Sequence, residues 1–158
     1  MKKTQQTDAG NLVTEIVLMV FRLDGMFMRA AEGIANPAGL TAARWRVLGA
    51  VLHDGHTVAE ISRQMGLARQ SVQPTADLLV RGGFASYEDN PRHKSAKLLV
   101  ATEKGLALVV SVAGRQAHWA NAVGAALDPE MLNTGYAFIN KLTDAVEKVE
   151  DLLERETA

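Results

Sequence analysis

The fold is decided by the stretch from Thr57 to Lys104, which reads TVAEISRQMGLARQSVQPTADLLVRGGFASYEDNPRHKSAKLLVATEK. It begins with Thr57 and Glu60 at the spacing of a capping box, in which the two side chains satisfy backbone N–H groups at a helix start. The helix is short, because Gly66 favours the left-handed conformation that ends a helix. A second helical pattern follows and ends at the glycine pair 82–83. Two helices joined by a short glycine-containing turn predict a helix-turn-helix, although an unrelated helical hairpin would give the same pattern.

A hairpin pattern comes directly after the second helix. Residues 84–88 (FASYE) and 97–102 (KLLVAT) have the composition of strands, and the turn formers DNPRHKS lie between them. A two-stranded hairpin is marginal on its own, so we expect it to lean on the helices as a wing. Its tip carries three potential cations, which suit a narrow minor groove or phosphates but also fit a solvated turn: Arg92, His93 and Lys94.

The second helix has a polar face near its N-terminus. Its side chains can bond to bases or phosphates, with a solvated polar face as the alternative: Arg69, Gln70, Ser71, Gln73 and Thr75. Arg69 in the first turn opposes the helix dipole, and a phosphate bound there would reverse the sign of that effect. Pro74 inside the helix would cost roughly 3 kcal/mol. We therefore expect the regular helix to start near Gln73, after an irregular or 3₁₀ turn from Ala68.

Long amphipathic patterns flank this central part. Apolar residues recur every three or four positions over 12–34, over 103–126 and from Pro129 almost to the C-terminus, and a shorter helix is predicted over 41–53. The central unit is too small to cover three long apolar stripes. A symmetric dimer through the terminal helices would bury them, and a monomeric bundle is the alternative. The predicted fold is mainly α with a small β-hairpin wing. Helices of 1–40 and 103–158 would serve dimerisation, and 41–102 would form the winged helix-turn-helix.

Composition limits the class of protein. The 158 residues are 47% hydrophobic, enough for one domain, and contain no cysteine, which excludes disulfides and thiol chemistry. No apolar run reaches the ~18 residues that span a bilayer, and no signal-peptide pattern is present, so we expect a cytoplasmic protein without membrane contact. Net charge is −1, but residues 41–100 carry +3 and the remainder −4. This asymmetry fits a basic surface on an acidic scaffold, or an ordinary fluctuation of charge.

Enzyme chemistry has no support in the sequence. The four histidines are scattered, and the pair His53 and His56 lacks a nearby third ligand. The motifs GxGxxG, GxxxxGK and GxSxG are absent. We expect neither catalysis nor a metal or cofactor.

The segments LTAARWRVLGAV, TVAEISRQMGLARQSVQPTADLLVRGGFA and DNPRHKSAKLLVATEKG together resemble the multiple antibiotic resistance regulator (MarR) family of winged-helix repressors. The residues that match the family's wing pattern are Asp89, Arg92, Lys94, Leu98, Thr102 and Gly105. Ala101 stands where the family usually has Leu. Pro74 departs from the polar or basic residue that the family commonly has there.

The resemblance implies a homodimeric repressor that binds double-stranded DNA at a pseudo-palindromic operator. It places the polar face of the second helix in or beside the major groove, with the wing cations alongside. It also implies release by a small aromatic ligand. The residues that could line the ligand pocket, with a plain apolar core as the alternative, are Met26, Phe27, Trp45, Arg46, His118 and Trp119. The alternative is a helical dimeric interaction module in which Pro74 has weakened or abolished DNA binding.

Overall fold

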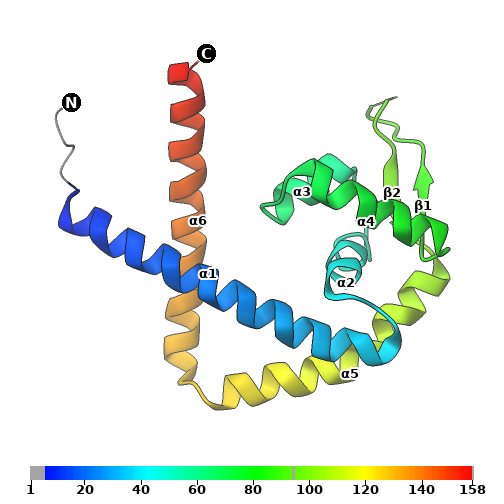
Figure 1. Ribbon diagram of the computed structural model, residues 1–158, viewed down its shortest axis with the longest axis horizontal. Coiled ribbons are helices and arrows are strands. Elements are labelled where there is room, and N and C mark those ends of the chain that lie inside the picture. The colour runs from blue at the N-terminus through cyan, green and yellow to red at the C-terminus, as the bar shows by residue number, and fades with distance from the viewer. Residues whose placement is uncertain (1–5, 94, 158) are drawn as a thin grey trace. The chain divides into compact units, whose positions relative to one another are not determined.

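The computed structural model describes residues 6–93 and 95–157, which form two compact units, one extending to Gly114 and one beginning at Arg115. The first unit contains seven elements and the start of α5: α1 (Asp8–Ala35), the 3₁₀ helix η1 (Asn36–Ala38), α2 (Ala42–Gly49), α3 (Val58–Gln64), α4 (Arg69–Arg81), β1 (Ala85–Glu88) and β2 (Leu98–Ala101). Helix α5 (Glu103–Ala125) runs across the division, and α6 (Pro129–Thr157) belongs to the second unit (Figure 1). The predicted fold, mainly helical with a β-hairpin wing, is confirmed.

The start and the end of α3 follow from local chemistry. The Thr57 hydroxyl oxygen accepts from the Glu60 backbone N–H at 3.2 Å, and the Glu60 carboxylate accepts from the Thr57 N–H at 2.7 Å. These bonds complete the capping box. The hydrogen bonds that the Glu60 carboxylate accepts from the Thr57 N–H, first, and from the Thr57 hydroxyl lower the pKa of Glu60. At the other end Gly66 has φ +61°, and the Leu67 N–H reaches back to the Ser62 carbonyl at 2.9 Å. Gly66 therefore ends helix α3, as the sequence predicted.

Helix α4 does not start where the sequence predicted. It begins at Arg69 and continues through Pro74, so the prediction of a regular start near Gln73 is wrong. Its first turn does include an i→i−3 hydrogen bond, from the Ser71 N–H to the Ala68 carbonyl at 2.9 Å. The N–H that Pro74 lacks would have bonded to the carbonyl of Gln70, four residues earlier. Gln70 is an exposed residue of the first turn, where water can reach the carbonyl, so the helix tolerates the proline.

The hairpin is anchored on both edges of β2. Strands β1 and β2 are antiparallel, with Ala85 opposite Ala101 and Glu88 opposite Leu98. On its other edge Leu99 exchanges two backbone hydrogen bonds with His56, at 2.8 and 3.2 Å. This third segment follows α2, which ends at Gly49 rather than near residue 53 as predicted. The bridge to His56 gives the hairpin the additional support that a two-stranded sheet needs.

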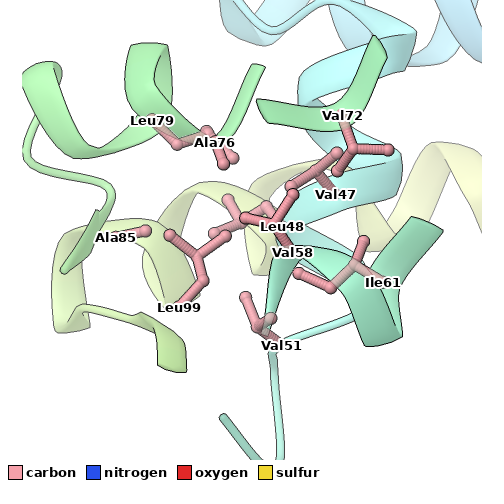
Figure 2. Packing of buried hydrophobic residues seen from close by; sticks show 10 residues of the cluster. All are labelled: Val47, Leu48, Val51, Val58, Ile61, Val72, Ala76, Leu79, Ala85 and Leu99. Atoms are coloured by element: carbon pink, nitrogen blue, oxygen red, sulfur yellow. The ribbon is translucent and has the colours of Figure 1, made fainter. Parts of the chain in front are cut away.

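One apolar core joins the helix-turn-helix to the hairpin. Its buried side chains come from α2, α3, α4, β1 and β2 and from the turn after α2, and Figure 2 shows them converging: Val47, Leu48, Val51, Val58, Ile61, Val72, Ala76, Leu79, Ala85 and Leu99. Helices α3 and α4 supply half of this set. Because the core holds the inner face of α4, its opposite face is left towards solvent.

The first turn of α5 is fitted closely to the end of the helix-turn-helix. The Thr102 hydroxyl donates to the Gly83 carbonyl at 2.8 Å and accepts from the Gly105 N–H at 3.2 Å. A Cβ on Gly105 would lie 2.0 Å from the carbonyl oxygen of Phe84, so only glycine fits at this position. Lys104 adds a hydrogen bond to the Gly82 carbonyl at 2.8 Å and lies over the Phe84 ring. The hairpin and α5 are therefore fixed to the C-terminal end of α4.

Two long helices keep large apolar side chains exposed. In α1 only Ile34 and Ala35 are buried, and the exposed set is Leu12, Val13, Val17, Leu18, Met19, Val20, Phe21, Leu23, Met26 and Phe27. In α6 it includes Met131, Leu132, Tyr136, Phe138, Ile139, Val146, Val149 and Leu152. Within residues 6–93 and 95–157, none of the helices is both long and apolar enough to cross a membrane.

Candidate nucleic-acid interface

The N-terminal half of α4 presents an exposed polar face. Arg69, Gln70 and Ser71 are exposed, as is Pro74 one turn after Gln70, and Thr75 is partly buried. Helical spacing explains this arrangement, because the buried stripe of the same helix lies on the opposite side: Val72, Ala76 and Leu79. Gln70 and Ser71 can therefore reach base edges or phosphates without any change in the helix.

Gln73 differs from its neighbours, because its side chain is engaged within the protein. Its amide nitrogen donates to a carboxylate oxygen of Asp77 at 3.0 Å and to the hydroxyl oxygen of Tyr87 at 2.9 Å. The Tyr87 hydroxyl donates to the same Asp77 oxygen at 2.8 Å. We call these three residues the Gln73–Asp77–Tyr87 network. It joins α4 to strand β1.

The electrostatics of this network agree with its geometry. The hydrogen bonds from Tyr87, first, and from Gln73 lower the pKa of Asp77, so its carboxylate is ionised at neutral pH. Burial, followed by the hydrogen bond to Asp77, raises the pKa of Tyr87 to about 12. The tyrosine therefore stays protonated and remains a donor.

A groove of about 1100 Å³ lies at the N-terminal end of α4. Its lining comes from the segment before α3, from α3 itself, from Arg69 at the start of α4, and from the hairpin loop up to the first residue of β2. Among the described residues that line it, three arginines outnumber two acids, and two histidines add ring nitrogens that can form hydrogen bonds: Arg63, Arg69 and Arg92, Asp54 and Glu60, and His56 and His93. A groove with this balance of charge suits a DNA backbone.

The hairpin loop holds its cations in a defined turn. The Arg92 N–H donates to the side-chain oxygen of Asn90 at 2.9 Å, and His93 and Ser95 share a hydrogen bond of 3.1 Å. Arg92 and His93 are exposed. Among the described residues, no carboxylate forms an ion pair with Arg92. Lys94, the third cation predicted for the wing tip, lies outside the described residues.

The residues predicted to bind a small ligand fall into both units. Met26 and Phe27 are 47% and 50% exposed on α1, and Trp45 and Arg46 of α2 are partly buried. Arg46 donates to the sulfur of Met28 at 3.3 Å, which connects α2 to α1. His118 (exposed) and Trp119 (partly buried) belong to the second unit. A pocket formed by all six stays a prediction.

The structure adds residues that the sequence did not single out. Arg63 and His56 line the groove, and Asp77 and Tyr87 hold Gln73. The spacing of four between Gln73 and Asp77 is a visible signal for a side-chain pair on a helix. Nothing in the sequence indicated Tyr87. In the part of the chain that the structure describes, no three His, Asp or Glu side chains are grouped as metal ligands.

Comparison with known proteins agrees with this geometry. Residues 38–94 match the model of the MarR family. Uncharacterized protein Rv2011c of Mycobacterium tuberculosis is 36% identical over 120 residues, which cover 76% of this chain and 84% of that protein.

Two solved structures share the fold. Staphylococcus aureus MarR, in complex with salicylate and kanamycin, has a TM-score of 0.72 at 19% identity, covering 87% of this chain and 93% of its own. The S. aureus MepR–DNA complex has a TM-score of 0.67 at 18% identity, covering 80% of this chain and 96% of its own. With the family match and the mycobacterial relative, the chain belongs to the MarR family of DNA-binding transcription regulators, which are not enzymes.

Proposed function

We propose that the protein is a cytoplasmic, homodimeric repressor that binds a pseudo-palindromic DNA operator and is released from it by a small aromatic ligand. The observation that carries the DNA-binding part is the arginine-lined groove at the N-terminal end of α4, where the exposed polar face of that helix begins. Gln70 and Ser71 are exposed on α4 and would read bases, and Arg69 and Arg92 line the groove and would contact phosphates. The MepR structure, which contains DNA, shares this fold.

The exposed apolar side chains of α1 and α6 support a homodimer. Monomers rarely expose large contiguous apolar surfaces, and a second copy would bury both sets by symmetry. Two copies of α4 would then be available to two half-sites of one operator, which is why a pseudo-palindrome is expected.

Release by a ligand is supported by the S. aureus MarR structure, which was determined with salicylate. Met26, Phe27, Trp45 and Arg46 offer aromatic, apolar and cationic groups that would suit an aromatic acid. Together with His118 and Trp119 they are the residues that we propose for this site.

DNA binding is tested by selecting bound sequences from random duplexes and then measuring affinity against salt concentration. Arg92→Ala should weaken binding similarly for all duplexes and reduce the slope of log K against log salt by about 1, because one phosphate contact is lost. Arg22→Ala is the matched control, because Arg22 is an exposed arginine of α1, away from the groove. Gln70→Ala should instead change the preferred sequence. Absence of salt-dependent binding to every duplex would refute the proposal.

A further inference from the structure

The Gln73–Asp77–Tyr87 network holds the nitrogen of the Gln73 amide. A glutamine recognises adenine with one N–H donor and its carbonyl oxygen together. Here the amide nitrogen donates to two acceptors within the protein, Asp77 at 3.0 Å and Tyr87 at 2.9 Å. Gln73 therefore cannot turn its amide towards an adenine without giving up these bonds.

The acceptor oxygen of Asp77 fixes which way the amide faces. If the Gln73 amide were turned over, its oxygen would meet the Asp77 carboxylate, which is ionised and accepts hydrogen bonds only. The Tyr87 hydroxyl has donated its single hydrogen to Asp77 and accepts from Gln73. Each member thus holds the others in one orientation.

The network also connects the two parts of the DNA-binding surface. Gln73 and Asp77 lie one turn apart on α4, and Tyr87 lies on β1, opposite the buried Leu99. Gln73 and Tyr87 together line a hollow of about 230 Å³ that also includes Arg69 and Lys97. The hydroxyl of Tyr87 therefore adds a polar link between the hairpin and α4 to the apolar core that already joins them.

We propose that Tyr87 and Asp77 are positioning residues for DNA recognition, which occupy the donors of Gln73 and hold the wing in register with α4. This inference rests on the proposed DNA binding and deepens it. Gln73 then has a structural role in α4, and Gln70 and Ser71 are the residues that recognise bases by hydrogen bonds. The Tyr87 hydroxyl then helps to place the wing cations relative to α4.

The first experiment compares the sequences selected by the wild-type protein and by Tyr87→Phe. The phenyl ring preserves packing and removes only the hydroxyl, so one N–H of Gln73 becomes available to a base. Tyr87→Phe should gain a preference for adenine at one position in each half-site, of at least about fivefold. Ser86→Ala is the control, because it removes a hydroxyl from the neighbouring residue of β1, which lies on the other face of the strand and outside the network. It should select the wild-type sequence.

A second pair of variants separates positioning from stability. Asp77→Asn keeps an oxygen that can accept both hydrogen bonds, whereas Asp77→Ala removes it. The asparagine variant should keep the wild-type sequence preference, and the alanine variant should shift it as Tyr87→Phe does. A role limited to stability would lower the melting temperature of these variants without changing which sequences they select.

The link to the wing is tested by a double-mutant cycle with Arg92→Ala. Tyr87→Phe should weaken binding by about fivefold in the wild-type background, as expected for one hydrogen bond. With Arg92 absent it should cost less than about twofold, because the wing contact is already lost. Additive effects together with an unchanged selected sequence would overturn the inference while leaving DNA binding intact. If the wild-type protein bound no duplex at all, the proposed function itself would fail, and this inference with it.

Discussion

Replacing Pro74 by alanine should stabilise the protein. Pro74 is the sixth residue of α4 and removes one hydrogen bond, to the carbonyl of Gln70. A proline in a helix interior costs about 3 kcal/mol relative to alanine. Part of that cost is absent here, because Gln70 is exposed and water can reach its carbonyl. We therefore expect Pro74→Ala to raise the free energy of unfolding by about 1–3 kcal/mol.

Thermal unfolding followed by circular dichroism is the assay. For a chain of this size each kcal/mol shifts the melting temperature by about 2–4 °C, so a rise of roughly 2–12 °C is expected. Wild type and variant must be compared at equal protein concentration, because the proposed dimerisation would make the melting temperature depend on it. Pro91→Ala is the control: Pro91 lies in the exposed hairpin loop, and its loss should destabilise by about 0.4–1 kcal/mol through the unfolded chain. An unchanged or lower melting temperature for Pro74→Ala would refute this account of α4.

The same variant tests whether Pro74 impairs the binding of DNA by α4. Helix α4 is continuous from Arg69, and both Gln70 and Ser71 are already exposed. Pro74→Ala should therefore bind the duplexes that the wild-type protein selects. If Pro74→Ala bound DNA and the wild-type protein did not, the protein would be an interaction module whose reading helix the proline had disabled.

Two further predictions concern stability. Gly105→Ala should lower the free energy of unfolding by about 3 kcal/mol, because its Cβ would lie 2.0 Å from the Phe84 carbonyl oxygen and backbone must move. Gly114→Ala in the same helix should raise it by about 0.5–1 kcal/mol, because no neighbouring heavy atom lies within 4 Å of the added Cβ. Denaturant unfolding of both variants checks the contrast, and a loss of stability in both would contradict it. Glu60→Ala should be less stable than wild type at neutral pH, and the difference should vanish in acid, because a carboxyl with a lowered pKa stabilises the fold only while ionised. Melting temperatures measured from pH 7 down through the ordinary Glu pKa test this, and a difference that persisted in acid would contradict it.

Elements fixed by neighbouring residues were the ones that sequence could predict. The capping box of Thr57 and Glu60 and the left-handed Gly66 lie within ten residues of one another and determine α3 by themselves. The buried stripe of α4 follows from helical periodicity in the same way. By contrast, the bridge between His56 and Leu99 joins residues far apart in sequence, and no local pattern required it.

Proline 74 shows a different reason for failure. The cost of a proline was known from the sequence, but whether the chain would avoid it depended on the surroundings of one carbonyl. Because the Gln70 residue faces solvent while the next turns of α4 are anchored in the core, keeping the helix costs less than displacing Val72 and Ala76. The packing of the inner face overrode the preference of a single residue on the outer face.

Gln73 shows why residue type alone cannot predict which side chains of α4 recognise bases. Polar character and position on α4 made it equivalent to Gln70, yet its hydrogen-bonding partners are Asp77, four residues away, and Tyr87, 14 residues away in the wing. Only the first separation is visible in a helical pattern. Whether a glutamine on such a helix recognises a base depends on whether its donors are already used, and that is decided by the strand packed beside it. In this protein the wing would therefore influence specificity twice, through its own cations and through the tyrosine that occupies Gln73.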